Sequence, residues 1–222
     1  MRRGSFLDPL GTIHRGLHRR LEQNRHLLHG RLLDLGCGER PYERLARDAG
    51  ATWQVAVDRL ELSPRVAADA LALPFLDGTF DAVLMTEVLE HVPEPGRVLN
   101  EVARVLSPSG ALVLTTPWAW PLHEEPRDFY RYTPWGLRHL LSSAGFRNVS
   151  VEKSGGLLAA GGQRAATALL YGTGLGRSRA GEWALAPLAG LLQAVGELLD
   201  RALGSRGEPL NYVAVGRKGA GP

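Results

Sequence analysis

The sequence predicts an α/β protein built on a doubly wound, mostly parallel sheet, and two observations carry this prediction. Apolar, strand-like runs alternate with helical patterns from residue 31 to about 116, which is the order of parallel strands joined by right-handed crossover helices. The first run, RLLDLGCGERPY (31–42), contains three leucines and then the turn Gly36-Cys37-Gly38. A continuous apolar strand of this kind is typical of a sheet that is covered on both faces.

The glycine turn after the first strand has the character of a ligand-binding loop. Glycine lets the backbone bend sharply and lets a ligand approach without a Cβ in the way. We expect Pro41 at the first position of the next helix, whose N-terminus would offer N–H groups to an anionic ligand group. Pro41 occupies the place of the third glycine in the dinucleotide pattern G-x-G-x-x-G, which disfavours a nicotinamide cofactor. A structural turn without a ligand is the alternative.

Acidic residues follow at the ends of later apolar runs. Asp58 ends TWQVAVD, 20 positions after Gly38, where a carboxylate at a strand tip can accept hydrogen bonds from ribose hydroxyls. Asp69 comes after another short apolar run, and GTFDAVLMTEVLEHV then gives a further strand that leads into Glu87 and His91. NEVARVLSPSGALVLTTP adds a helix, a turn and a fifth strand.

These motifs, in this order, resemble the class I S-adenosylmethionine (SAM) methyltransferases of the type 11 group. The resemblance covers about residues 31–153 and a last strand near 210–217. It implies a Rossmann-like sheet of seven strands, the last antiparallel, and SAM as the cofactor. The residues expected to hold the cofactor are Asp34, Gly36, Cys37, Gly38, Asp58, Asp69, Ala70 and Glu87. Glu39-Arg40-Pro41 departs from the family pattern, which often has another glycine here.

Two histidines are the candidate catalytic residues. Methyl transfer from a sulfonium is an in-line displacement, which is accelerated largely by positioning the donor and the acceptor. His91 follows the fourth strand at the carboxyl edge of the sheet, where ligands bind in such folds. Its imidazole can take a proton near neutral pH, as can that of His123. The alternative for His91 is a structural role in its loop.

The segment TPWAWPLHEEPRDFYRYTPWG (116–136) is the candidate acceptor site. Its density of aromatic and charged side chains suits a polar, planar or sugar-like acceptor. The expected substrate-binding residues are Trp118, His123, Glu124, Asp128, Tyr130 and Arg131. The segment also resembles methyltransferases that modify bacterial surface glycans and lipids. A structural Asp128–Arg131 ion pair is the alternative, and nucleic acid is not expected because no recognition module is present.

We expect a single domain over residues 1–222. It divides into an N-terminal helical cap (1–30, with a basic amphipathic helix over 12–29), a core (31–153), a helical insertion (155–208) and a last strand (209–218). An apolar stripe over 182–203 predicts either a face packed on protein, as a cap or dimer surface, or peripheral contact with a membrane or a lipid-linked acceptor.

The composition bears on the cellular compartment and on metal binding. The chain has 222 residues and a net charge of +3. Its one cysteine, Cys37, excludes internal disulfides and fits a reducing compartment. Without an apolar leader or an 18-residue apolar run, we expect a cytoplasmic protein, with the inner membrane face as an alternative location. His14 and His18 lack a third ligand at a suggestive spacing, so no metal is expected.

The sequence therefore predicts a SAM-dependent methyltransferase that acts on an O or N nucleophile of a small molecule or of a glycan or lipid precursor. The alternative is a non-catalytic SAM-fold partner or scaffold that binds membrane or protein through residues 155–208. The acceptor, the methylated atom and the oligomeric state are open from the sequence.

Overall fold

The computed structural model describes residues 4–59, 66–172, 174, 178–204 and 207–219, and the chain forms two compact units. One unit consists of Met1–Arg20, Trp118–Pro121 and Lys153–Asn211. The other consists of Leu21–Pro117, Leu122–Glu152 and Tyr212–Pro222, and it carries most of the sheet.

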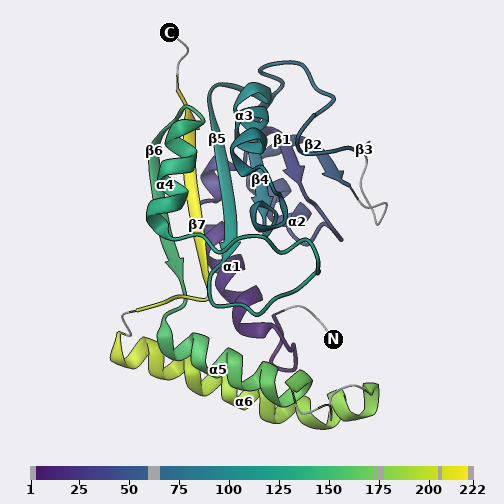
Figure 1. The fold of residues 1–222 in the computed structure, drawn as a ribbon, viewed down its shortest axis with the longest axis vertical. Helices are drawn as coiled ribbons and strands as arrows, with labels where there is room; N and C mark the ends of the chain where they lie inside the picture. Colours follow the sequence, from purple (N-terminus) through teal and green to yellow (C-terminus); the bar gives the residue numbers. More distant parts are fainter. Residues whose placement is uncertain (1–3, 60–65, 173, 175–177, 205–206, 220–222) are drawn as a thin grey trace. The chain divides into compact units, whose positions relative to one another are not determined.

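The sheet has seven strands in the order β3-β2-β1-β4-β5-β7-β6 (Figure 1). Their bounds are β1 Gly30–Leu35, β2 Ala51–Asp58, β3 Val66–Ala67, β4 Phe80–Thr86, β5 Leu106–Pro117, β6 Phe146–Ser154 and β7 Asn211–Lys218. The pairings among β1 to β5 are parallel, and β7 is antiparallel. The predicted fold class, including the antiparallel last strand, is confirmed.

The central strands form because their side chains are apolar on both faces. Leu32 and Leu33 of β1 are buried, as is the stretch Ala82–Met85 of β4, which is what a parallel sheet covered by helices requires. Near the first residues of β1 and β4, Arg31 binds the carboxylate of Asp81 with two N–H groups, at 3.1 and 2.8 Å. The register that follows places Asp34 beside Ala56 on one side and Leu84 on the other.

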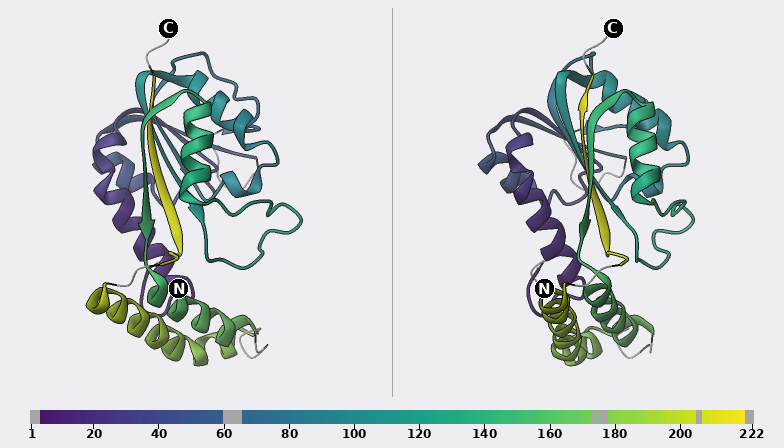
Figure 2. Two further views of the ribbon diagram at one scale, coloured as in Figure 1. Left: turned by 60° about the vertical axis from the view of Figure 1, so that its left-hand side comes forward. Right: turned by 90° about the vertical axis from the view of Figure 1, so that its left-hand side faces the viewer.

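Helices cover both faces of this sheet (Figure 2). Helices α3 and α4 lie on one face and the short α2 lies on the other. The bounds are α1 Gly11–Gln23, α2 Glu43–Asp48, α3 Pro95–Val105 and α4 Pro134–Ser143, with short 3₁₀ turns η1 Arg25–Leu27 and η2 Leu89–His91.

The ends of α4 are set by the residues that cap it. The Thr133 hydroxyl accepts a hydrogen bond from the Gly136 N–H at 3.0 Å, Pro134 occupies the first turn, and Gly145 after the helix has a φ of +85°. These are the N-cap, N1 and C′ positions that such residues favour.

Two local predictions are wrong. Pro41 is not at the first helical position, because α2 begins at Glu43 with Tyr42 as its N-cap. The helix predicted over 12–29 ends at Gln23 and is followed by η1, since Leu27 and Leu28 turn into the core there.

The first unit contains a helical hairpin, α5 Leu157–Thr167 and α6 Arg179–Leu203, joined through the π-helical turn η3 Ala168–Gly172. The two helices lie side by side (Figures 1 and 2) and meet at a glycine pair. A Cβ added at Gly162 would stand 2.5 Å from the Leu192 carbonyl oxygen, and one added at Gly196 would stand 2.7 Å from that of Leu158. Only glycine allows this approach of the two backbones.

The N-terminal segment is bound to this hairpin. The Gln163 side-chain amide donates to the Pro9 carbonyl oxygen at 2.8 Å, and that of Gln193 donates to the same oxygen at 3.0 Å. Arg15 of α1 pairs with Glu197 of α6 at 2.5 Å. Polar contacts from two helices therefore hold the N-terminal segment and α1 against the hairpin.

The predicted apolar stripe is present on α6, and much of it faces solvent. Its exposed members are Trp183, Leu188, Leu191, Val195, Leu198, Leu199 and Leu203. Within the described part of the chain, no helix is both long and apolar enough to cross a membrane.

Candidate cofactor and acceptor site

A cavity of about 630 Å³ opens at the carboxyl ends of β1, β2 and β4, within the size range of small-molecule sites. The loop after β1, the end of β2, the segment after β3 and the turn after β4 each contribute to its wall. The residues that line it include Gly36, Gly38, Asp58, Asp69, Ala70, Glu87, Val88, His91, Glu124 and Arg127. This is the sheet edge at which α/β proteins bind ligands.

The glycine loop is shaped by close contacts. Gly36 has a φ of +72°, and a Cβ there would stand 2.1 Å from Cγ2 of Val88. Gly38 has a φ of +46° with nothing within 4 Å of its added Cβ, and its N–H donates to the Asp58 carboxylate at 2.9 Å. Gly36 is therefore required by packing and backbone, whereas a side chain at Gly38 would enter open space at the cavity wall.

Asp34 and Cys37, which the sequence predicts as cofactor residues, are buried behind the loop and are not among the residues that line the cavity. Burial raises the pKa of Asp34 to about 7 and that of Cys37 to about 11. The Cys37 side chain is consequently a neutral thiol that fills space.

The cavity wall fits a nucleoside cofactor. Asp58 ends β2 with its carboxylate fixed by the Gly38 N–H, the placement that suits hydrogen bonds from ribose hydroxyls. Asp69 accepts a hydrogen bond from the Leu71 N–H at 2.9 Å and lines the same cavity with Ala70. Glu87 also lines it and accepts a hydrogen bond from the Thr115 hydroxyl at 2.6 Å.

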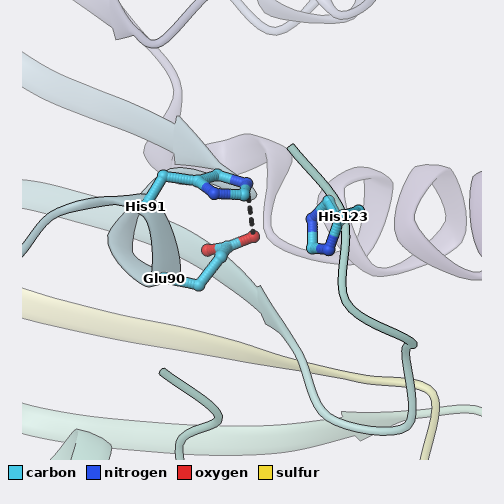
Figure 3. Close-up of side chains that lie close together, drawn as sticks. All are labelled: Glu90, His91 and His123. Atoms are coloured by element: carbon cyan, nitrogen blue, oxygen red, sulfur yellow. Dashed lines mark ion pairs between the residues drawn. The ribbon is translucent and has the colours of Figure 1, made fainter. Parts of the chain in front are cut away.

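His91 and His123 lie together beside the cavity (Figure 3). Their ring centroids are 4.8 Å apart, with the rings at 77° to one another. The His91 Nδ1 lies 2.9 Å from the Arg127 carbonyl oxygen. Because a carbonyl oxygen only accepts, Nδ1 is the nitrogen that donates to it. The His91 ring is thus held in one orientation, with Nε2 toward Glu90 and Glu124, and it lines the cavity with Glu124.

Glu90, which the sequence analysis did not single out, lies next to the two histidines. It is fully buried, and its Oε1 is 3.8 Å from the Nε2 of His91. Burial, together with the charge of Glu87, raises the pKa of Glu90 well above its usual range. The sequence contains one sign of this residue's importance. It is a second acidic residue after Glu87, directly before His91, in a stretch that is otherwise apolar.

Three of the predicted substrate residues hold their own segment in place. Arg131 binds both carboxylate oxygens of Asp128, at 2.5 and 2.7 Å, and its guanidinium keeps the pKa of Asp128 well below the usual range. Tyr130 donates from its hydroxyl to the Pro93 carbonyl oxygen at 3.0 Å. This is the arrangement of the structural alternative for Asp128 and Arg131.

The remaining predicted substrate residues divide between the two units. Glu124 lines the cavity, and the backbone N–H of His123 donates to Asp128 at 3.1 Å. Trp118 belongs to the first unit, where it packs against the buried cluster of Ala119, Ala160 and Leu210. Seven of the predicted site residues therefore line the cavity together with His91. Trp118 does not line it.

Known proteins are similar to this chain in sequence and in fold. The family model described as "Methyltransferase domain" matches residues 10–151. Methyltransferase GfsG of Streptomyces halstedii is 35% identical over 128 residues, which are 50% of this chain and 46% of that protein. The ubiquinone biosynthesis O-methyltransferase of Caulobacter sp. (strain K31) is 38% identical over 101 residues, 39% of this chain and 40% of that protein. The matches thus span less than half of these relatives.

Solved structures extend the similarity over nearly the whole chain. The cyclase SpnF superimposes with a TM-score of 0.62 at 25% identity, covering 94% of this chain and 82% of that one. A SAM-dependent methyltransferase from Archaeoglobus fulgidus has a TM-score of 0.59 at 19% identity, covering 93% and 94%. The chain belongs to the methyltransferase domain family, with the class I fold whose cofactor is SAM.

Proposed function

We propose that this chain transfers a methyl group from SAM to an O or N nucleophile of a small molecule or of a glycan or lipid precursor. The observation that carries the proposal is one continuous cavity wall that joins the glycine loop and Asp58 to His91 and Glu124. The similarity to an enzyme named as an O-methyltransferase supports an oxygen acceptor.

The residues at the two ends of the cavity have different roles. SAM supplies a methyl group on a sulfonium. Asp58 and Asp69 hold and orient the nucleoside end, and the open space at Gly38 admits the cofactor close to the backbone. His91 and His123 stand at the acceptor end, where imidazole nitrogens serve as proton acceptors or as ligands of a cation. Most of the acceleration then comes from alignment of the reacting atoms.

A transfer assay with tritiated SAM and a panel of phenols, sugar hydroxyls and amines tests this proposal. The wild type should label at least one acceptor class, and Asp58→Asn should lower kcat/KM about tenfold or more, because a hydrogen bond to a charged group contributes about 1.5–3 kcal/mol. Asp48→Asn, at an exposed position of α2, is the matched control. A wild type that binds no SAM contradicts the proposal.

The exposed stripe on α6 supports a further part of this proposal, peripheral contact with a membrane interface. Trp183 and the exposed leucines lie on one helix, and such side chains on the apolar face of a helix are typical of interfacial helices. Co-sedimentation with phosphatidylglycerol vesicles should be lost in Leu191→Glu/Leu198→Glu. A dimer in light scattering that the same change dissociates would assign the stripe to a second copy instead.

A further inference from the structure

Three potential metal ligands converge beside the cavity. One ligand atom each of Glu90, His91 and His123 lies within 4.8 Å of the other two. Figure 3 shows the Glu90 carboxylate lying close to the His91 imidazole, with the His123 ring beside them. Glu90 and His91 come from η2, and His123 comes from the segment after β5.

The Glu90 carboxylate is an independent sign of a ligand. The residue has no exposed surface, and neither of its carboxylate oxygens has a hydrogen-bond partner among the described residues. Buried polar groups are nearly always satisfied, and a buried carboxylate without a partner costs several kcal/mol or takes a proton. A cation between Glu90 and the histidines would satisfy both oxygens and neutralise the charge.

Both histidines have an acceptor close to Nδ1, which leaves Nε2 as the nitrogen available to an ion. The Arg127 carbonyl oxygen accepts from Nδ1 of His91 at 2.9 Å. The Asp128 carboxylate lies 3.1 Å from Nδ1 of His123 and is itself held by Arg131. Metal-binding histidines donate their second ring N–H to a carbonyl or carboxylate in this way, which orients the ring and raises its basicity.

The spacing of the three ligands requires only a small movement. Ligands bound to one ion at about 2.1 Å stand about 3 to 4 Å from one another. Here the Nε2 of His91 is 3.8 Å from Glu90, and the widest separation in the cluster is within 4.8 Å. Side-chain movements of about 1 Å would bring the three ligand atoms to this spacing, and small changes of χ within a rotamer well can provide them.

We propose that Glu90, His91 and His123 bind a divalent transition-metal ion of the Mn²⁺, Fe²⁺ or Zn²⁺ class, and that the ion coordinates the acceptor oxygen. Two imidazoles and one carboxylate suit these ions and leave coordination positions open. The inference rests on the proposed function for its role in catalysis, because His91 lines the cavity.

Methyl transfer to a metal-bound oxygen needs no oxidant or reductant. Coordination lowers the pKa of an acceptor hydroxyl, so that its proton passes to water. The oxygen lone pair then forms the bond to the methyl carbon as the sulfur–carbon bond of the sulfonium breaks. The ion keeps its oxidation state. With its Nε2 on the ion, His91 would act as a ligand and not as the base.

Calorimetric titration of the full chain, freed of metal with EDTA, with CoCl₂ and MnCl₂ tests the site. We expect one ion per chain, a cobalt d–d absorption spectrum, and binding at least tenfold weaker in His123→Ala and Glu90→Gln. His139→Ala, at an exposed position of α4, should bind as the wild type does. Cobalt should raise the Tm of the wild type and not that of Glu90→Gln.

S-adenosylhomocysteine binding, measured on the same samples, separates the two proposals. Equal cobalt affinity in the wild type and His123→Ala, with S-adenosylhomocysteine still bound, would overturn the metal site and leave the proposed function standing. In that case Glu90 is a protonated carboxyl, and Glu90→Gln should be as stable as the wild type. If the wild type does not bind S-adenosylhomocysteine, the proposed function is contradicted instead.

Discussion

Adding a methyl group at Gly36 should strongly destabilise the folded protein. The φ of this residue is +72°, and an added Cβ would stand 2.1 Å from Cγ2 of Val88, which lines the cavity. A left-handed conformation costs an L-residue about 1–2 kcal/mol, and overpacking adds about 1–3 kcal/mol. Gly36→Ala should therefore lower the free energy of unfolding by about 2–5 kcal/mol and weaken S-adenosylhomocysteine binding.

Urea denaturation of Gly36→Ala, Val88→Ala and the double variant separates the two contributions. Val88→Ala removes the clashing methyl and leaves the backbone strain, so the double variant should regain about 1–3 kcal/mol relative to Gly36→Ala. A fall of less than about 1 kcal/mol in the free energy of unfolding of Gly36→Ala, or no recovery on changing Val88, would refute this prediction.

Two further predictions concern Asp34 in one unit and Gly162 in the other. The pKa of Asp34 is raised to about 7, so the folded state holds a proton that the unfolded chain releases near pH 4, and stability falls as pH rises between these values. Asp34→Asn should be more stable than the wild type by about 2–4 kcal/mol at pH 8 and similar to it at pH 4; parallel stability curves would contradict this. Gly162→Ala should separate α5 from α6, cost about 1–3 kcal/mol and speed limited proteolysis of the hairpin. Gly161→Ala, with nothing within 4 Å of its added Cβ, is the control and should be neutral or stabilising.

The sheet and the cofactor side of the cavity could be predicted from local patterns. Apolar strands, the glycine turn and the acids at strand ends are each encoded within about ten residues. The parallel topology then brings Gly38, Asp58 and Asp69 to one edge. The errors at Pro41 and at the end of α1 are shifts of a few residues, because tertiary contacts of Tyr42 and Leu27 set those boundaries.

The acceptor side was less predictable because it depends on contacts between distant segments. His123 follows His91 by 32 residues, a separation that matches no ligand pattern, and the two rings meet only because the intervening segment folds back. Tyr132 anchors that segment by donating to the Leu89 carbonyl oxygen, and Phe129 donates from its backbone to Glu90. The buried state of Glu90 is likewise a tertiary property.

Calorimetric titration with S-adenosylhomocysteine tests the central claim most directly. We predict micromolar binding to the wild type, binding at least tenfold weaker in Asp58→Ala, and unchanged binding in the control Asp48→Ala. Loss of one charged hydrogen bond in a cavity is worth about 1.5–3 kcal/mol, which corresponds to this factor. No binding to the wild type, or equal affinity in the wild type and Asp58→Ala, would contradict the assignment of this cavity to the cofactor.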